Sequence, residues 1–211
     1  MKDKLLVDIG NTRVHMLQGG KIVHISKERL FRQYGERRLC YINVNHTLNA
    51  KLESNKNWIN LADFLSIEGE YDTMGVDRKA ICLSYESGIF VDAGSAITVD
   101  IVKKGRYIGG YILPGIKEYL KAYQSISPVL EVKIDKACDL SKLPKKTSGA
   151  ISYGIISSII SSIKKERMAH KLPLYLTGGD GAWLTSFFKE AIYDEGLLFK
   201  GLQNATKDKI C

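Results

Sequence analysis

Two short stretches of the sequence each place an aspartate between apolar residues and a glycine turn. The first reads Val7-Asp8-Ile9-Gly10 and continues with Asn11-Thr12, and the second reads Val91-Asp92-Ala93-Gly94 and continues with Ser95. Glycine lets the backbone approach a ligand closely, and a serine or threonine hydroxyl adds a hydrogen-bond donor. Backbone N–H groups in such a turn form a concave site for an anion. Both stretches are therefore candidate phosphate-binding turns.

A third aspartate, Asp77, follows a chain-breaking glycine in the stretch Gly75-Val76-Asp77-Arg78. It falls where a helix through about Tyr85 could begin, and the partial positive charge of a helix N-terminus favours an ionised carboxylate there. Aspartate is also one of the commonest helix caps. Spacing alone leaves open whether Asp77 takes part in chemistry or only caps the helix.

The two aspartate turns each join the strands of a predicted β-hairpin. In the first hairpin Val14 to Leu17 is the return strand, and in the second it is Ala96 to Val102. Because the hairpins match in order and spacing, they indicate a duplicated half-domain rather than a repeat array. The sequence thus predicts two α/β lobes, residues 1–84 and 85–211, with a cleft between them in which two phosphate turns could hold a nucleotide.

The rest of the chain reads as alternating strands and helices. Helices are predicted over Lys27–Tyr34, Ile116–Ile126 and Thr147–His170, the first capped by Ser26 and the last by Thr147 or Ser148. Further strands are predicted at Ile22–Ile25, Leu39–Val44, Leu130–Ile134, Leu174–Thr177 and Gly196–Leu202, and the turn Gly178–Gly181 is predicted to lead into a helix through about Glu190. In α/β folds, a strand, glycine turn and helix place backbone amides beside a ligand.

Composition sets the outer limits. With 211 residues, 45% of them hydrophobic, the chain has enough core for one large or two small domains. No apolar run reaches the roughly 20 residues of a membrane span, and four cysteines without paired spacing favour reduced thiols in a cytoplasm. The net charge of +8 indicates either an anionic partner, nucleotide or nucleic acid, or simply solvated lysines.

Taken in order, five motifs make the chain resemble the type III pantothenate kinases. They are Asp8–Thr12, Gly75–Arg78, Asp92–Ala96, Gly109–Gly115 and Thr177–Asp180. The resemblance implies a duplicated actin-like ATPase (ribonuclease H-like) fold, with two lobes and the active site in the cleft between them. It also implies ATP-dependent phosphorylation of pantothenate to 4′-phosphopantothenate, the first step toward coenzyme A, by a cytoplasmic homodimer.

The same resemblance implies roles for individual residues. Asp77 is the expected proton acceptor, and Asp92 the expected ligand of a monovalent cation, K⁺ or NH₄⁺. The expected ATP-binding residues are Asp8, Ile9, Gly10, Asn11, Thr12, Arg13, Val14, His15 and Ser95, and the expected pantothenate-binding residues are Tyr71, Gly75, Val76, Asp77, Arg78 and Thr147. Ser95 stands where the family usually has threonine, and Thr147 follows Lys146 where asparagine is more usual.

These roles agree with the chemistry of phosphoryl transfer, which depends mostly on positioning and charge neutralisation. Mg²⁺ bound with ATP prefers carboxylate neighbours, and Asp8 is our candidate. Asp77 needs only to accept a hydroxyl proton late in the transfer, so an ordinary carboxylate pKa would suffice. We further hypothesise that Arg78 pairs with the pantothenate carboxylate through its guanidinium fork.

Two other readings stay open at the level of sequence. One is a different small-molecule kinase or an ATPase on the same fold, because the phosphate motifs suit any of these. The other is a non-catalytic regulator that binds nucleic acid through its basic surface. The presence of Asp8, Asp77 and Asp92 together argues against the regulator, so nucleic acid is not an expected partner, and neither is a membrane.

Overall fold

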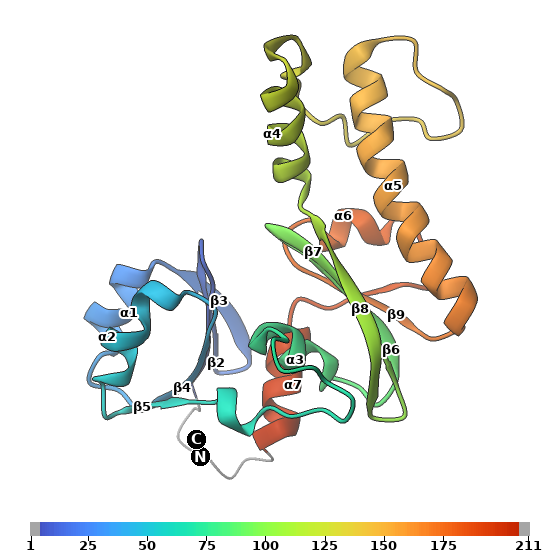
Figure 1. Ribbon diagram of the computed structural model, residues 1–211. Helices are drawn as coiled ribbons and strands as arrows, with labels where there is room; N and C mark the ends of the chain where they lie inside the picture. Colours follow the sequence, from blue (N-terminus) through green and yellow to red (C-terminus); the bar gives the residue numbers. More distant parts are fainter. Residues whose placement is uncertain (1–4, 207–211) are drawn as a thin grey trace. The chain divides into compact units, whose positions relative to one another are not determined.

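The computed structural model describes residues 5–206, which form two compact units. The first unit contains the chain up to Glu86, Val102–Gly109 and the segment from Glu195, and the second contains Ser87–Ile101 and Gly110–Asp194. Each unit is built around a five-stranded sheet (Figure 1).

The sheet of the first unit carries the first aspartate turn. Its strands are β1 (Leu6–Ile9), β2 (Val14–Gln18), β3 (Lys21–Ile25), β4 (Leu39–Asn43) and β5 (Trp58–Asn60), in the order β3-β2-β1-β4-β5. The first three strands are antiparallel, whereas β4 runs parallel to β1 and β5 parallel to β4. This register sets Asp8 opposite His15 on β2 and Ile9 beside Asn43 at the end of β4.

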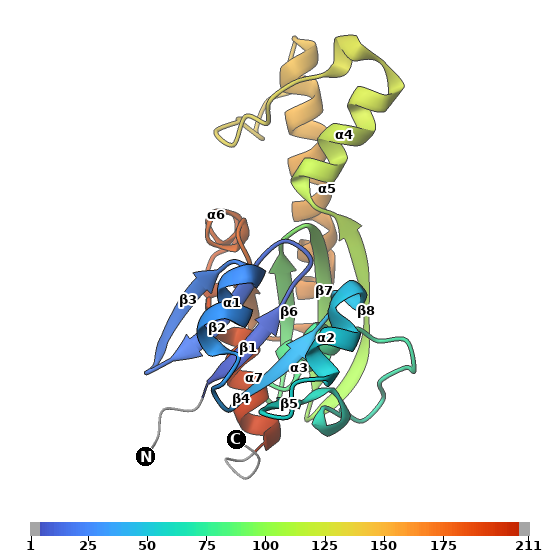
Figure 2. The same cartoon turned by 90° about the vertical axis from the view of Figure 1, so that its left-hand side faces the viewer.

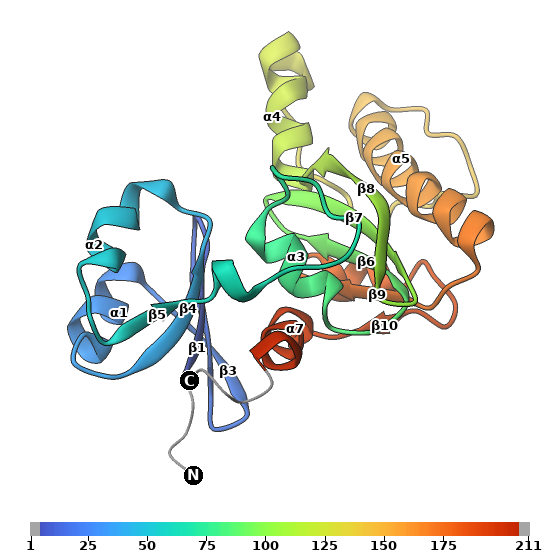
Figure 3. The same ribbon diagram turned by 60° about the horizontal axis from the view of Figure 1, so that its bottom comes forward.

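Short helices complete the first unit. They are α1 (Lys27–Tyr34), α2 (Asn49–Glu53), α3 (Val76–Cys82) and α7 (Leu197–Thr206), with 3₁₀ turns at His46–Leu48 and Ala62–Phe64. The predicted cap of α1 is confirmed, since the Ser26 hydroxyl accepts a hydrogen bond from the Arg29 amide at 3.2 Å. Helix α7 lies beside α3, as Figures 1 and 3 both show, and Phe199 and Leu202 enter the same buried cluster as Leu6, Ile42 and Ala80.

The sheet of the second unit repeats this plan. Its strands are β6 (Gly88–Ala93), β7 (Ala96–Lys103), β8 (Arg106–Pro114), β9 (Leu174–Thr177) and β10 (Ile192–Tyr193), in the order β10-β9-β6-β7-β8. Read from the other edge, the order is β8-β7-β6-β9-β10: three consecutive strands followed by two parallel ones, as in the first unit. The predicted duplication is therefore confirmed.

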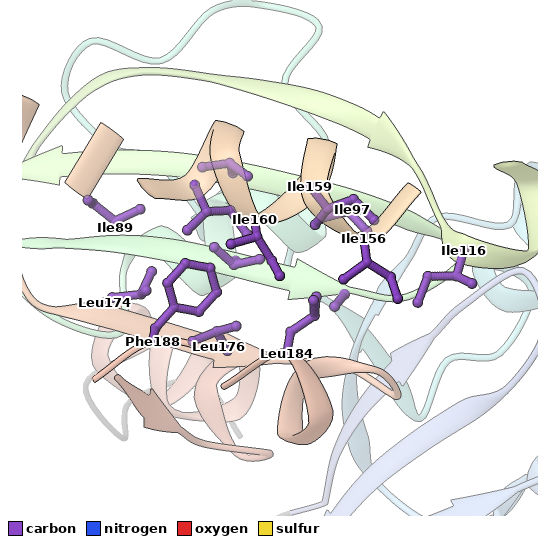
Figure 4. Close-up of a cluster of buried hydrophobic side chains, with 14 of the residues drawn as sticks. Ile89, Ile97, Ile116, Ile156, Ile159, Ile160, Leu174, Leu176, Leu184 and Phe188 are labelled. Carbon is purple, nitrogen blue, oxygen red and sulfur yellow. The ribbon is translucent and has the colours of Figure 1, made fainter. Parts of the chain in front are cut away.

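Helices pack on the second sheet and bury its apolar face. They are α4 (Ile116–Ile126), α5 (Thr147–His170) and α6 (Gly181–Thr185), with a 3₁₀ turn at Pro128–Leu130. The isoleucines of α5 meet the sheet in the core shown in Figure 4, where Ile156, Ile159 and Ile160 face the strands and Leu184 and Phe188 close the opposite side. The buried isoleucines of α5 thus form a core contact.

Four local predictions are wrong. Leu130–Ile134 forms no strand, and Gly196–Leu202 lies mostly in helix α7. The helix after Gly178–Gly181 ends at Thr185, well before Glu190. The cap position of α5 is Lys146 without a side-chain capping bond, and not Thr147 or Ser148, which lie in its first turn.

Two composition-based expectations can also be compared with the described residues. Cys82 and Cys138 are free thiols, as the expectation of reduced cysteines requires at these two positions. Among residues 5–206, no helix is both long and apolar enough to cross a membrane.

Candidate functional site

The first aspartate turn is closed by its own backbone. Asp8 lies half-buried on β1, and the Gly10 amide donates to the Arg13 carbonyl at 3.0 Å. A Cβ on residue 10 would lie 3.0 Å from that same oxygen, tighter than most Cβ contacts, which explains the glycine. Asn11, Thr12 and Arg13 are exposed. The turn therefore presents polar and cationic groups as the phosphate hypothesis requires.

Two residues near this turn, Lys27 and Asn43, lie outside all of the sequence motifs. The Lys27 ammonium of α1 donates to the Asn11 carbonyl at 2.7 Å and brings a second positive charge to the turn. At the end of β4, the Asn43 amide donates to the Asn45 carbonyl at 2.9 Å and to Asn49 Oδ1 at 2.8 Å. The parallel pairing of β1 and β4 sets Asn43 beside Ile9, a proximity that only strand order could have predicted.

A row of polar side chains runs across the first sheet from Asp8. His15 lies opposite Asp8, and His24 lies opposite His15 with the two imidazole rings 4.7 Å apart. His24 Nε2 is 3.1 Å from Glu195 Oε1. Burial, and then the neighbouring His24 and Arg13, lower the pKa of His15, while Glu195 opposes the shift. His15 is therefore held as a neutral imidazole at neutral pH.

Asp77 occupies the first turn of α3, two residues after the cap position, so it is not the helix cap. Gly75 is the cap residue, and Asp77 Oδ1 accepts a hydrogen bond from the Arg78 amide at 2.8 Å. A Cβ on residue 75 would lie 2.6 Å from Asp77 Oδ1. Gly75 thus makes room for this carboxylate.

Arg78 is buried, with 5% of its surface exposed, and is held by two tyrosines. Its Nη1 donates to the Tyr71 hydroxyl at 2.5 Å and its Nη2 donates to the Tyr107 hydroxyl at 3.1 Å. Two of the predicted substrate residues, Tyr71 and Arg78, are therefore in contact. Sequence reasoning missed Tyr107, which is 29 positions from Arg78 and lies outside all five sequence motifs.

In the second unit, the aspartate turn is packed against the start of α4. The Gly94 amide donates to the Ala96 carbonyl at 3.0 Å, and the Gly115 amide donates to the Ser95 carbonyl at 3.1 Å. A Cβ on residue 115 would overlap the Ser95 carbonyl and lie 2.5 Å from the Gly94 oxygen. Gly115 therefore allows α4 to begin directly on the turn, and Ser95 stays exposed.

The glycine turn after β9 reaches the same place. Gly178 has φ of +85°, and a Cβ there would overlap Asp92 Oδ1 and lie 2.6 Å from the Ala93 carbonyl. The Asp180 amide donates to that carbonyl at 2.9 Å. The second unit thus brings Asp92 and Ser95 together with Gly115 and the Gly178–Asp180 turn.

Thr147 is not part of this cluster. It is exposed at the start of α5, and that end of α5 extends beyond the sheet of its own unit, beside α4 (Figures 1 and 2). The flanking residues Lys146 and Ser148 line a cavity of about 450 Å³ together with Lys133 and Lys145. The surroundings of Thr147 are therefore cationic.

The side chains of the candidate site suit a metal ion that arrives bound to a ligand, and not one held by protein side chains alone. Within residues 5–206, no group of three or more histidine, cysteine or acidic side chains could hold a metal ion. Mg²⁺ bound to a nucleotide needs only one or two carboxylates, because phosphate oxygens and water supply the rest. The single carboxylate of Asp8, beside a candidate phosphate-binding turn, fits this type of site.

Comparison with known proteins agrees with these features. The sequence model of the family described as type III pantothenate kinase matches residues 41–170. A curated relative of that name from Helicobacter hepaticus is 41% identical over 207 residues, covering 98% of this chain and all of the relative. Another from Campylobacter jejuni is 40% identical over 204 residues and covers 97% of each chain.

Solved structures give the same picture of the fold. A Campylobacter jejuni protein, described as belonging to the Baf family of transcriptional activators, is 39% identical with a TM-score of 0.86, over 97% of this chain and 98% of that one. The ethanolamine utilization protein EutJ from Carboxydothermus hydrogenoformans has a TM-score of 0.50 at 15% identity, covering 96% of this chain and 88% of that one, which concerns the fold alone. With the two sheets of matching strand order, these similarities establish the actin-like ATPase fold.

Proposed function

The chain belongs to the type III pantothenate kinase family, and on that premise we propose that it transfers the γ-phosphoryl group of ATP to the primary hydroxyl of pantothenate. The observation that carries the proposal is the identity of about 40% with curated kinases of this name over nearly the whole chain. The products are ADP and 4′-phosphopantothenate.

Phosphate binding falls to the two aspartate turns. The segment Asp8 to His15 supplies backbone amides and the exposed side chains of Thr12 and Arg13, and Ser95 supplies a hydroxyl donor from the other turn. Lys27, fixed on the Asn11 carbonyl, adds positive charge to the first turn. Mg²⁺ held beside Asp8 would neutralise phosphate charge during transfer.

Asp77 is the proton acceptor in this proposal. Its Oδ1 is oriented by the Arg78 amide, so the carboxylate has a defined direction before substrate binds. It accepts the proton of the pantothenate hydroxyl as the bond to phosphorus forms. Because the transition state of phosphoryl transfer is loose, an ordinary carboxylate is basic enough for this step.

Pantothenate binding involves Tyr71, Gly75, Val76, Arg78 and Thr147. The hydroxyls of Tyr71 and Tyr107 fix the Arg78 guanidinium, and from that position it pairs with the pantothenate carboxylate. The lysine-lined cavity beside Thr147 is suited to an anionic substrate.

Three further properties complete the proposal. Asp92 binds a monovalent cation, K⁺ or NH₄⁺, with its Oδ1 directed at the space that the absent Cβ of Gly178 leaves. The protein is a cytoplasmic homodimer with the pantothenate site near the subunit interface. This arrangement accommodates the position of Thr147, which lies apart from the Asp92 turn of its own unit.

The first test is ADP production from ATP and Mg²⁺, with and without pantothenate, in potassium and then in sodium buffer. We expect turnover that requires both pantothenate and potassium or ammonium. Asp77→Asn, which is nearly isosteric, should lower kcat by about 10²- to 10⁴-fold, the usual contribution of a general base. Turnover that does not depend on pantothenate would instead identify an ATPase or a kinase for another substrate.

A regulator is the second candidate, because one solved relative is described as a transcriptional activator. It predicts no turnover by the folded protein in any buffer, together with a strongly salt-dependent shift of DNA or RNA at micromolar protein. Pantothenate-dependent ADP release without such a shift removes this candidate.

A further inference from the structure

Residues 67–71 form an irregular segment, here called the strap, that leads to the proposed pantothenate residues and lies beside the start of β8. Within it, Glu68 forms an isolated parallel bridge with Arg106. The Tyr107 amide donates to the Glu68 carbonyl at 2.7 Å. Because the strap belongs to no helix or strand, the rest of it depends on side-chain contacts for its position.

Glu70 joins the strap to helix α3 through both oxygens of its carboxylate. Oε2 accepts a hydrogen bond from the Ile67 amide at 2.9 Å, which closes a turn within the strap. Oε1 accepts from the Lys79 ammonium of α3, also at 2.9 Å. The side chains of Glu70 and Lys79 are only 25% and 17% exposed, so solvent screens this pair less than a fully exposed one. The carboxylate therefore ties the strap to the helix.

Two adjacent residues of the strap contact two adjacent residues of α3. Glu70 holds Lys79, and the next residue, Tyr71, accepts a hydrogen bond from Arg78 through its hydroxyl. Asp77, the proposed proton acceptor, directly precedes Arg78 and accepts from its amide. Because consecutive residues of a helix move together, a shift of Lys79 displaces Arg78 and Asp77 as well.

We propose that Glu70 is a positioning residue for the phosphorylation of pantothenate. By holding Lys79, it sets the first turn of α3 so that Asp77 and Arg78 meet the substrate in the required geometry. The inference rests on the proposed function, in which Asp77 accepts the hydroxyl proton and Arg78 pairs with the pantothenate carboxylate. Glu70 acts through Lys79 and does not itself touch the substrate.

The two contacts of Glu70 explain why an acidic side chain stands at this position. An ionised carboxylate has two acceptor oxygens, whereas a glutamine amide has one acceptor oxygen and an NH₂ donor. With glutamine at position 70, that oxygen can face the Ile67 amide or the Lys79 ammonium, and the NH₂ group then faces the other donor. The substitution Glu70→Gln therefore keeps the size of the side chain but breaks the link between strap and helix.

The test is steady-state kinetics of Glu70→Gln, with Glu68→Gln as the matched control on the same strap. We expect Glu70→Gln to lower kcat/KM for pantothenate by about 10- to 100-fold, because a misplacement of about 1 Å can cost about 10²-fold. KM for ATP should stay unchanged, because the strap contains no residue of the phosphate-binding turns. Glu68→Gln should change neither parameter, since the Glu68 carboxylate is 74% exposed and only pairs with Arg106 at 3.5 Å.

Substitutions of Lys79 separate positioning from a general loss of stability. Lys79→Met removes the ammonium and should reproduce the fall in kcat/KM for pantothenate. Lys79→Arg keeps a cationic donor for Glu70 and should retain most of the activity. In the double variant of Glu70→Gln and Lys79→Met the two losses should not add, because both substitutions break the same contact. Urea unfolding of each variant identifies any that is not fully folded under assay conditions.

Hydrogen exchange of the α3 amides separates this inference from the kinase assignment. In Glu70→Gln and Lys79→Met, the amides of Arg78 and Lys79 should exchange about 10-fold faster than in the unmodified protein, since the first turn of α3 opens more often. If the unmodified protein gives no turnover with pantothenate, the proposed function fails, and the exchange rates still decide whether Glu70 positions α3.

Three results would overturn the inference. The first is kcat/KM for pantothenate that is unchanged in Glu70→Gln and Lys79→Met, or lowered in only one of them. The second is an equal loss in Glu68→Gln, and the third, in a protein without turnover, is unchanged exchange of the α3 amides. Should Glu70→Gln fail to fold, Lys79→Met and Lys79→Arg decide the question, and equal losses in these two would contradict the role of the ion pair.

Discussion

At the scale of single residues, Arg78 combines a structural and a proposed binding role. Arg78→Ala should raise KM for pantothenate, because the carboxylate loses its cationic partner. It should also lower the free energy of unfolding by about 1–3 kcal/mol, because the hydroxyls of Tyr71 and Tyr107 lose a charged donor. Steady-state kinetics and urea unfolding measure the two effects. An unchanged apparent affinity for pantothenate would dispose of the binding role.

Tyr107→Phe is the matched control for Arg78→Ala. It removes one hydrogen bond to the same guanidinium, at 3.1 Å, but no residue proposed to touch substrate. We expect a loss of about 1 kcal/mol in stability, with KM changing much less than in Arg78→Ala. A rise in KM as large as that of Arg78→Ala would mean that the arginine acts only through local structure.

For Tyr111, in contrast to Arg78 and Tyr107, we expect a substitution to preserve or raise the free energy of unfolding. Its hydroxyl is buried and, within the described part of the chain, has no hydrogen-bond partner. An unsatisfied buried polar group costs about 1–3 kcal/mol, so Tyr111→Phe should leave stability unchanged or raise it by up to that amount. Urea midpoints at pH 7 measure the difference. A clear loss of stability would show that the hydroxyl does have a partner.

The same residue gives a pH dependence with a defined sign. Burial, and secondarily Glu166, raise the pKa of Tyr111 from 10.0 to about 12. Between these values the unfolded chain releases the proton more readily than the folded one, so stability is lost as pH rises through this window. When the pH rises from about 9 to about 11, the free energy of unfolding should therefore fall less in Tyr111→Phe than in the unmodified protein. This pH range includes the ordinary pKa of tyrosine, near 10, at which the loss begins. Equal losses would contradict the shift.

At the scale of elements, glycines in two helices should respond oppositely to alanine. In α7, a Cβ on Gly201 would overlap the Ala80 carbonyl of α3, so Gly201→Ala must separate the helices and should destabilise by about 1–3 kcal/mol. In α5, the nearest atom to a Cβ on Gly154 is the Tyr123 hydroxyl at 3.7 Å, an ordinary contact. Gly154→Ala should therefore stabilise by about 0.5–1 kcal/mol through helix propensity. Thermal and urea unfolding of both variants check the contrast.

The elements also show which predictions a sequence can carry. Both hairpins and their aspartate turns follow from local signals, because glycine turns and apolar runs lie within a few residues of each other. The stretch Gly196–Leu202 looks like a strand because a short apolar run fits either period. In the structure this stretch is helical and Gly201 packs against Ala80 of α3. Ala80 lies far away in the sequence, so local patterns do not reveal this contact.

In the candidate site, too, local contacts could be predicted from the sequence and long-range contacts could not. Asp77, Arg78 and Tyr71 lie within one local segment, and a motif can mark them together. Tyr107 reaches Arg78 over 29 positions, and Lys136 reaches Asp180 over 44. These contacts depend on how strands and helices pack, which has no signature in a single sequence.

At the scale of the whole molecule, we expect a dimer. The chain has a mass of 23.6 kDa, so light scattering after size-exclusion chromatography should give about twice that value. We expect a dimer because Thr147 is separated from the Asp92 turn of its own chain and is therefore available to a neighbouring subunit. A monomer that is fully active at assay concentrations would contradict both the dimer and the role of Thr147.

The position of α7 has a consequence for how the protein is made. The cluster that contains Leu6 and Ile42 from the N-terminal strands is completed by Phe199 and Leu202. A ribosome releases the first strands long before it reaches these residues, so the nascent N-terminal segment cannot bury that face alone. The second unit, contained in Ser87–Ile101 and Gly110–Asp194, can assemble earlier during synthesis. The unit that begins the chain is therefore the one whose core closes last, and until then its apolar strands are a substrate for chaperones.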